Sequence, residues 1–136
     1  MQPAIYGPGD RAVAVIIRDG AIVLIHRQKR DRAYYVLPGG SIEADETPAA
    51  ACGREVAEET GLVVRGTTYL CTLSNQGRAE HYFLVEVEHD RLVLGGPERE
   101  RHTTDNQYQP VWIDRTTMTT LNIQPPELRQ LILTHL

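Results

Sequence analysis

A helix with clearly marked ends is the feature that most restricts how this chain can fold. Thr47 is a typical N-cap residue and Pro48 follows it at the first helical position. Gly61 is the residue type that most readily ends a helix in the left-handed conformation. These signals predict a helix over about Pro48–Thr60, around which the rest of the chain has to be arranged.

Three carboxylates share one face of this predicted helix. At about 100° per residue, Glu55, Glu58 and Glu59 fall close together. Like charges so placed repel each other, by about 0.2–0.5 kcal/mol per pair in an isolated helix. A separate face carries small or apolar residues: Ala49, Cys52, Gly53, Val56 and Thr60. We expect the small residues to pack closely against a sheet, and the carboxylates to face a cleft that takes a divalent cation.

Segments of strand character surround the helix. They are residues 11–18, 21–26, 62–64, 67–73, 81–88 and 110–113. Asp19-Gly20 is a strong hairpin signal between the first two segments. Residues 28–34 are predicted to be a polar loop, and residues 125–136 an amphipathic closing helix. The pattern predicts an α/β protein with one domain over residues 1–136.

Composition excludes several classes of protein. Apolar residues make up 41% and charged residues 24%, as is usual in soluble globular proteins. A net charge of -4 gives no basic footprint for general nucleic-acid binding. No apolar run approaches the roughly 18–20 residues that cross a bilayer, and the N-terminus does not resemble a signal peptide. Cys52 and Cys71 form no metal or disulfide pattern, so we expect buried thiols and a cytoplasmic location.

The helix also belongs to a longer motif. From Gly40 to Leu62 the chain has glycine, five residues, glutamate, seven residues, Arg-Glu-Val, one residue, Glu-Glu, one residue and Gly-Leu. This stretch resembles the signature of the Nudix hydrolases, of the MutT-like kind, at every fixed position. The resemblance implies an α/β/α sandwich with a mixed central sheet, and the strand order around the motif is similar.

The resemblance also implies an enzyme that acts on phosphoric anhydride bonds. Its substrate would be a nucleoside diphosphate linked to another group, cleaved with Mg²⁺ or, as the alternative, with Mn²⁺. By position in the motif, Glu58 and Glu59 would be metal ligands, and Glu55 either a further ligand or the base that activates water. The carbonyl of Gly39 or Gly40 would add a backbone ligand. Magnesium prefers oxygen ligands and keeps several waters, so a few carboxylates suffice.

The remaining motif residues would support this site. Arg54 would orient a glutamate, and Glu46 would anchor the loop to the helix. Gly40 and Gly61 would adopt backbone angles that a side chain disfavours. In several family members the base is a glutamate on a later loop, for which Glu98 and Glu100 are candidates; a solvated charge run is the alternative.

The substrate is less defined. The proline of ADP-ribose enzymes and the tyrosine of dinucleoside polyphosphate enzymes have no equivalent at residues 75–79, and the coenzyme A marker is absent. A nucleoside triphosphate or modified nucleotide is therefore the leading interpretation. The alternatives are an ADP-ribose or nucleotide-sugar pyrophosphatase, and a catalytically silent nucleotide-sensing module. The chain is expected to be a monomer or a homodimer.

Several residues outside the motif have two interpretations each. The aromatic residues either stack on a base or pack in the core: Tyr34, Tyr35, Tyr82 and Trp112. The basic residues before the motif either reach phosphates or form a solvated loop: Arg27, Lys29, Arg30 and Arg32. His26 and His81 lie in strand patterns and are interpreted as structural or lining residues.

Overall fold

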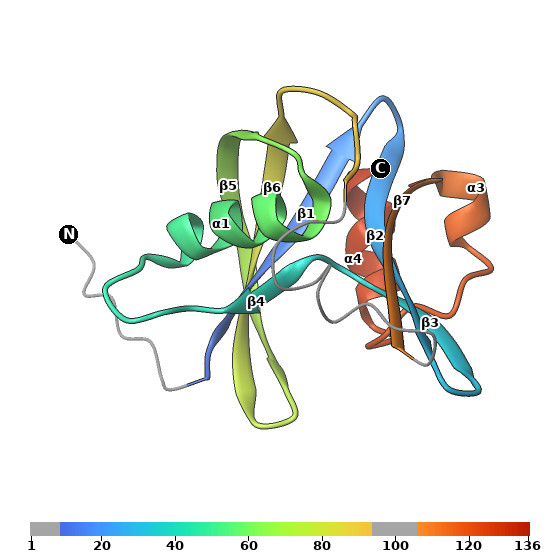
Figure 1. Cartoon of the computed structure of the whole chain (residues 1–136), viewed down its shortest axis with the longest axis horizontal. Coiled ribbons are helices and arrows are strands. Elements are labelled where there is room, and N and C mark those ends of the chain that lie inside the picture. The colour runs from blue at the N-terminus through green and yellow to red at the C-terminus, as the bar shows by residue number, and fades with distance from the viewer. Residues whose placement is uncertain (1–8, 94–105) are drawn as a thin grey trace.

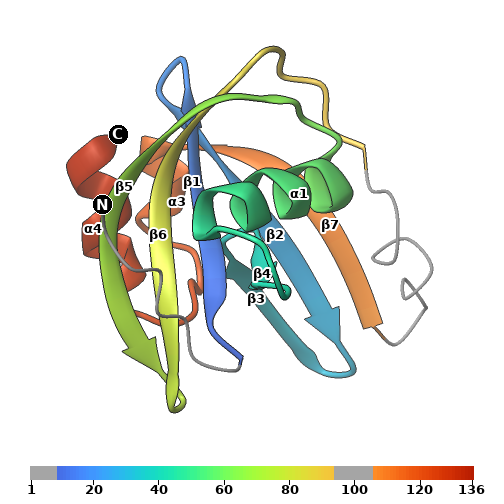
Figure 2. The same cartoon turned by 90° about the vertical axis from the view of Figure 1, so that its left-hand side faces the viewer.

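The chain folds into a mixed sheet covered on both faces by helices (Figure 1 and Figure 2). The computed structural model describes residues 9–93 and 106–136. The elements are β1 (Arg11–Arg18), β2 (Ala21–Lys29), β3 (Arg32–Val36), β4 (Gly39–Ser41), α1 (Pro48–Thr60), β5 (Val64–Asn75), β6 (Arg78–Val87), β7 (Asn106–Asp114), α3 (Arg115–Met118) and α4 (Leu128–His135). Helix α1 covers one face of the sheet, and α3 and α4 cover the other. The predicted α/β/α class and the closing helix are confirmed.

Strand β1 lies at the centre of the sheet. The strand order is β3-β2-β1-β6-β5, with β4 paired to β1 and β7 paired to β2. Strand β1 runs parallel to β6 and antiparallel to β2 and β4. The short β4, which carries Gly39 and Gly40, is thereby fixed against residues 11–13 of β1. This pairing sets the position of the glycine-rich turn before α1 begins.

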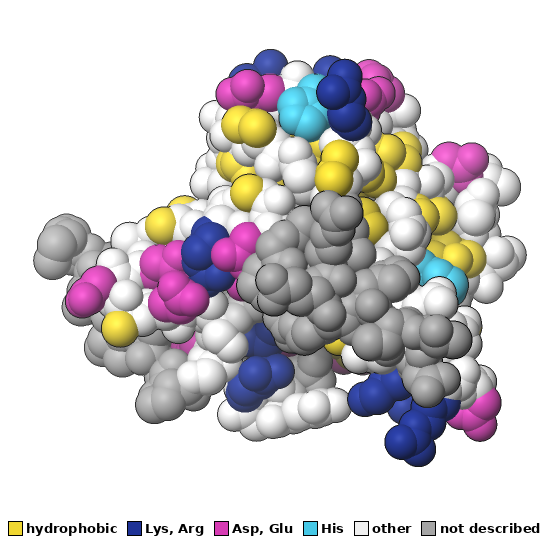
Figure 3. Space-filling model, viewed as in Figure 1, with side chains coloured by type: hydrophobic (Ala, Val, Ile, Leu, Met, Phe, Trp, Pro, Cys, Tyr) yellow, Lys and Arg dark blue, Asp and Glu magenta, His cyan; other side chains and the backbone are white. Residues whose placement is uncertain are grey.

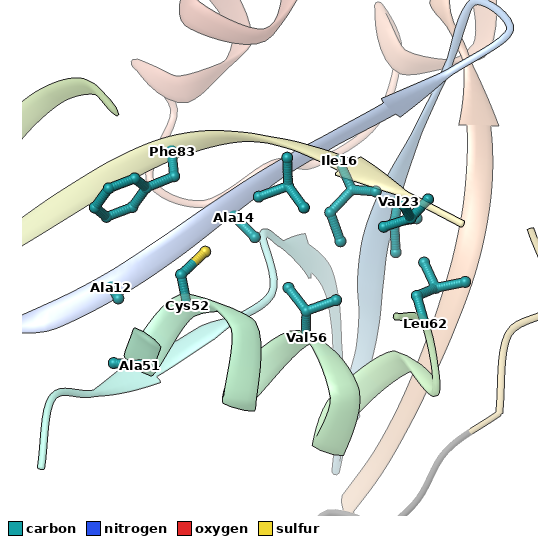
Figure 4. Close-up of a cluster of buried hydrophobic side chains, with 11 residues drawn as sticks. Ala12, Ala14, Ile16, Val23, Ala51, Cys52, Val56, Leu62 and Phe83 are labelled. Atoms are coloured by element: carbon teal, nitrogen blue, oxygen red, sulfur yellow. The ribbon is translucent and has the colours of Figure 1, made fainter. Parts of the chain in front are cut away.

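Two cores form on opposite faces of β1 because its side chains alternate in direction. Ala12, Ala14 and Ile16 pack against α1, as Figure 4 shows, and the small alanines let the helix approach the sheet closely. Val13 and Val15 pack on the other face against residues of α3 and α4. A strand buried on both faces reads as a continuous apolar run, which is how this segment appears in the sequence.

The hairpin turns follow local backbone preferences. Asp19 and Gly20 both have positive φ angles, 53° and 78°, as the predicted tight hairpin requires. Gln76 and Gly77 make a second turn of this kind between β5 and β6, with φ angles of 53° and 78°. Asp19 and Gln76 occupy a region that most side chains avoid, whereas Gly20 and Gly77 adopt positive φ without a steric penalty.

The predicted polar loop over residues 28–34 is wrong. Strand β2 continues to Lys29 and β3 begins at Arg32, so only a two-residue turn separates them. The predicted segments 62–64 and 67–73 also differ, because β5 is one strand with two register shifts against β6. Strand β7 extends well beyond the predicted residues 110–113. Its Pro110 is tolerated because, among the described residues, β7 pairs with β2 alone.

Candidate functional site

Helix α1 has the ends that the sequence predicts. The Thr47 hydroxyl accepts a hydrogen bond from the amide of Ala50 at 3.1 Å. Gly61 adopts the left-handed conformation with φ of 75°, and its amide donates to the carbonyl of Ala57. A Cβ at Gly61 would lie 3.0 Å from atoms of Val93, so close packing excludes a side chain as well. Both ends of the helix are therefore fixed.

The buried face of α1 differs from the predicted one. Glu55 and Glu59 are each only 9% exposed, because β4 lies against this part of the helix. Ala51 is fully buried in the α1-facing core, whereas nothing lies within 4 Å of a Cβ built on Gly53. The predicted small-residue face is therefore buried at Cys52, Val56 and Thr60 but not at Gly53, and two of the carboxylates are buried as well. Two of the three glutamates are held between the helix and the glycine turn.

Arg54 lies at the centre of the carboxylates. Its Nε and Nη2 donate to the two carboxylate oxygens of Glu46 at 2.7 and 3.0 Å, a bidentate pair. Its Nη1 donates to Glu55 Oε1 at 2.7 Å and lies 3.5 Å from Glu58 Oε2. Its Nη2 also donates to the carbonyl of Ser41 in β4 at 3.0 Å. We call Arg54 and the four glutamates Glu46, Glu55, Glu58 and Glu59 the acidic cluster. Figure 3 shows acidic side chains around a basic one in the region of α1.

Hydrogen bonding between Arg54 and Glu46 shifts the pKa of both side chains. The bonds from Arg54 hold the pKa of Glu46 below its ordinary value of 4.5. The same bonds, with a further one to Glu55, raise the pKa of Arg54. Glu46 also accepts a bond from the amide of Glu43 at 2.9 Å, which closes the loop before α1. The geometry is that expected of a loop anchor, while the functional role of Glu46 stays a prediction.

Gly39 and Gly40 are required by close approach rather than by unusual backbone angles. The amide of Gly39 donates to Glu59 Oε1 at 2.8 Å. A Cβ on Gly40 would lie 2.5 Å from both carboxylate oxygens of Glu55. Gly40 is absent from the described residues with positive φ, so the expectation of a special backbone angle there is wrong. At Gly61 the same expectation is confirmed.

The donor set suits a hard divalent cation. The carboxylates of Glu55, Glu58 and Glu59 and the backbone of Gly40 offer only oxygen, which is what magnesium prefers. Across residues 9–93 and 106–136, no three acidic, histidine or cysteine side chains converge into a preformed metal centre. Magnesium needs only one or two carboxylates when waters and substrate phosphates complete its coordination, so the cluster fits a shared site.

The predicted bases Glu98 and Glu100 lie outside the described residues. His81, interpreted as structural, lies between Asp10 and Thr72, with its ring nitrogens 3.2 and 2.9 Å from their oxygens. Tyr82, one of the candidate stacking residues, is 1% exposed and donates to buried Glu80 at 2.9 Å. Burial, aided by the nearby carboxylate, raises the pKa of this phenol. Tyr82 is a core residue and cannot stack on a ligand.

Sequence reasoning missed one group of residues near the motif. Tyr108 and Asn106 of β7 lie beside Arg27 of β2, a contact between segments about eighty residues apart. The signal that links them is strand pairing, since β7 pairs with β2 over its full length. That pairing was not visible because residues 106–109 look like part of a polar loop.

Comparison with known proteins identifies the family. The NUDIX domain family matches residues 8–132, so the chain belongs to this family. The predicted resemblance is thereby confirmed, and membership supports the expectation of an enzyme that acts on pyrophosphate bonds. None of the described helices is long and apolar enough to cross a membrane.

Named relatives belong to more than one branch. The chain is 32% identical over 83 residues to an ADP-ribose pyrophosphatase of Methanocaldococcus jannaschii, covering 60% of this chain and 49% of that protein. It is 45% identical over 53 residues to a MutT-like protein of Streptomyces ambofaciens, covering 39% of this chain and 33% of that protein. The chain thus spans between a third and a half of the length of these relatives.

A solved structure agrees with the fold. One of the MutT proteins of Aliivibrio salmonicida and Vibrio cholerae superposes with a TM-score of 0.75 at 15% identity. The alignment covers 94% of this chain and 98% of that one. At this identity the similarity shows the fold alone.

Proposed function

We propose that this NUDIX domain hydrolyses a phosphoric anhydride bond in a nucleoside diphosphate linked to another group, with Mg²⁺ or Mn²⁺. A nucleoside triphosphate or modified nucleotide, as for a MutT-like pyrophosphohydrolase, is the substrate we favour. The observation that supports this most strongly is the placement of Glu55 and Glu59 beside the glycine turn, with Arg54 bonded to Glu55 and close to Glu58. Family membership agrees with it.

Each residue of the cluster has a proposed role. Glu58 and Glu59 would hold the cation, with Glu55 and the Gly40 carbonyl as further ligands. A bound divalent cation would neutralise phosphate charge and lower the pKa of a bound water. Arg54 fixes the direction of the Glu55 carboxylate through the bond at 2.7 Å. The base that takes the proton of the attacking water would be Glu55, or else Glu98 or Glu100.

A second candidate is a pyrophosphatase of ADP-ribose or a nucleotide sugar. It is favoured by the relative named ADP-ribose pyrophosphatase, although that similarity covers only 49% of the relative. A silent nucleotide-sensing module is disfavoured, because every acidic position of the motif is present. Residues 1–136 would form a single domain, as a monomer or homodimer. The two free cysteines, Cys52 and Cys71, agree with a reducing cytoplasmic location.

A substrate screen tests the proposal. The purified chain is incubated with nucleoside triphosphates, ADP-ribose and nucleotide sugars, with Mg²⁺, with Mn²⁺ or with a chelator, and the products are identified by chromatography. We expect release of pyrophosphate or of a nucleoside monophosphate only when metal is present. Absence of turnover with every substrate and both metals would leave the sensing module as the remaining explanation.

Glu59→Gln tests the metal assignment. Glutamine keeps an oxygen that can accept from the Gly39 amide, so the fold should survive while the charge is lost. We expect turnover to fall at least about 100-fold, since even residues behind metal ligands cost 10–100-fold. Glu86→Gln, at a carboxylate that is 69% exposed on β6, is the matched control. Near-normal turnover in Glu59→Gln contradicts the assignment. Full activity of a Glu98→Gln, Glu100→Gln double variant would leave Glu55 or an ordered water network as the base.

A further inference from the structure

A row of alternating arginine and tyrosine side chains crosses the end of the sheet formed by β7, β2 and β3. Arg27 of β2 is paired with Tyr108 of β7 on one side and with Tyr34 of β3 on the other. Its guanidinium carbon lies 3.9 Å from the centroid of the Tyr108 ring and 5.8 Å from that of Tyr34. The guanidinium of Arg32 lies 5.1 Å from the same Tyr34 ring. We call Tyr108, Arg27, Tyr34 and Arg32 the arginine–tyrosine row.

The row is on the same face of the sheet as the catalytic helix. Val23 of β2 packs in the core beneath α1. Arg27 follows it by four residues in the same strand, so both side chains point to that face. Tyr34 precedes Gly39 by five residues, and five residues span at most roughly 17 Å. The Tyr34 end of the row therefore lies within about that distance of the glycine turn that borders the acidic cluster.

The row contains a hydrogen-bond donor without a partner. Arg27 Nε is buried and makes no hydrogen bond to any residue that the structure describes. The other contact of this guanidinium, from Nη2 to Asn106 Oδ1, is long at 3.4 Å. A buried donor left unsatisfied costs about 1–3 kcal/mol, so such groups usually have a ligand or a structural reason. Here the tyrosine rings hold the Arg27 guanidinium through cation–π contacts, which do not provide hydrogen-bond acceptor oxygens for its N–H groups.

The charge around the row is uncompensated. Arg27 and Arg32 form no ion pair with a carboxylate of residues 9–93 or 106–136. The β2–β3 hairpin also carries Lys29 and Arg30 against a single acid, Asp31. Figure 3 shows basic side chains gathered at the end of this hairpin. A local excess of positive charge in a chain of net charge -4 indicates an anion site.

The geometry selects an anion over a nucleobase. A base would need a free aromatic face, but the Arg27 guanidinium lies over the Tyr108 ring, and the Arg27 and Arg32 guanidiniums both lie near the Tyr34 ring. The unmet N–H groups instead need an acceptor oxygen. Phosphate provides charged acceptor oxygens in the geometry that arginine binds best.

We propose that the arginine–tyrosine row binds a phosphate group of the substrate that is separate from the anhydride that is cleaved. The preferred substrates would then carry phosphate at two positions, one at the acidic cluster and one at the row. This inference rests on the proposed hydrolase function for its substrate, but the row binds phosphate whether or not turnover occurs.

A binding experiment in the presence of a chelator isolates the row. Without a divalent cation the acidic cluster repels phosphate, so calorimetric titration with adenosine 3′,5′-bisphosphate reports on the row. We expect Arg27→Gln to weaken binding about tenfold and the exposed Arg32→Gln about threefold, as for the loss of one charge-assisted hydrogen bond. Arg65→Gln removes the same charge at a site on β5 that is 62% exposed and should change nothing. Equal affinities for all four proteins would overturn the proposal.

A kinetic experiment then identifies the source of the phosphate. The specificity constant for adenosine 3′-phosphate 5′-diphosphate is compared with that for ADP in each protein, with metal present. We expect the wild type to prefer the substrate with the extra phosphate, and Arg27→Gln and Arg32→Gln to lose that preference. An equal loss on both substrates would show that the row binds the anhydride chain itself, which contradicts the proposal. If no substrate turns over, the hydrolase function fails while the chelator experiment still decides the row.

Discussion

Removing Arg54 should destabilise the protein far more than removing an ordinary surface arginine. Arg54 donates three charge-assisted hydrogen bonds of 2.7–3.0 Å, two to Glu46 and one to Glu55. In Arg54→Met, Glu55 loses its hydrogen bond from Arg54. The Glu55 side chain is only 11% exposed and shares the cluster with two other carboxylates of α1. Breaking a buried pair costs about 3–5 kcal/mol. The side chains of Arg54 and Glu46 are 25% and 18% exposed, so solvation of the unpaired groups offsets part of this cost. We therefore expect the free energy of unfolding to fall by about 2–3 kcal/mol.

Urea unfolding of Arg54→Met and Arg65→Met provides the comparison. Arg65 lies 3.3 Å from Glu86 in a pair whose side chains are 62% and 69% exposed, so Arg65→Met should cost no more than about 0.5 kcal/mol. Arg54→Lys keeps the charge but not the bidentate geometry and should fall between the two. An Arg54→Met variant as stable as Arg65→Met would refute the view that this guanidinium holds the cluster together.

The Arg54 effect should also depend on pH in a defined direction. Its hydrogen bonds lower the pKa of Glu46 in the folded state, so the stabilisation is present above the ordinary value of 4.5. It is lost as the pH falls through the lowered folded-state pKa. The difference in unfolding free energy between wild type and Arg54→Met should therefore be full near neutral pH and shrink in acid. A difference that grows below pH 4.5 would contradict the assigned pair.

Two further results are expected. Gly40→Ala should reduce turnover sharply, because its Cβ would lie 2.5 Å from the Glu55 oxygens. Gly53→Ala has open space around its Cβ and should stabilise α1 by about 0.5–1 kcal/mol. Turnover and thermal unfolding of both variants check these expectations. Cys52 is fully buried, and burial together with the charge of Glu55 raises its pKa to about 12. A thiol reagent at mild pH should therefore label Cys71 first, as peptide mass spectrometry will show. Equal labelling of both cysteines in the folded protein would contradict this expectation.

The parts of the fold that could be predicted are those specified by nearby residues. The ends of α1 follow from Thr47, Pro48 and Gly61, whose preferences act within one turn of the helix. The first hairpin follows from Asp19-Gly20, where both residues adopt positive φ. These features need no information from the rest of the chain, so the sequence predicts them at the observed residues.

The parts that could not be predicted depend on contacts between distant segments. Arg27 and Tyr34 lie in strands although their surroundings are polar, because β2 gains partners on both sides. The burial of Glu55 and Glu59 likewise follows from the position of β4 and not from the helix itself. A helical projection places Glu55 and Glu59 on one face, but it carries no information on how far β4 and the glycine turn bury them.

The negative charge of the acidic cluster and the positive charge of the β2–β3 hairpin together influence the orientation in which a substrate would bind. The acidic cluster contains four glutamates and one arginine, while the β2–β3 hairpin carries four basic residues and one aspartate. Each phosphate of a substrate is therefore attracted to the hairpin and repelled by the cluster until a cation is bound. Before a cation is bound, a substrate with phosphate at one end only would place that end at the hairpin, which is unproductive for cleavage at the cluster. A second phosphate removes this conflict, since one group occupies the hairpin while the anhydride lies at the cluster. The positive charge of the hairpin would then both strengthen binding and select the productive orientation. For this reason we expect the arginine–tyrosine row to affect substrate preference more than the turnover of simple nucleotides.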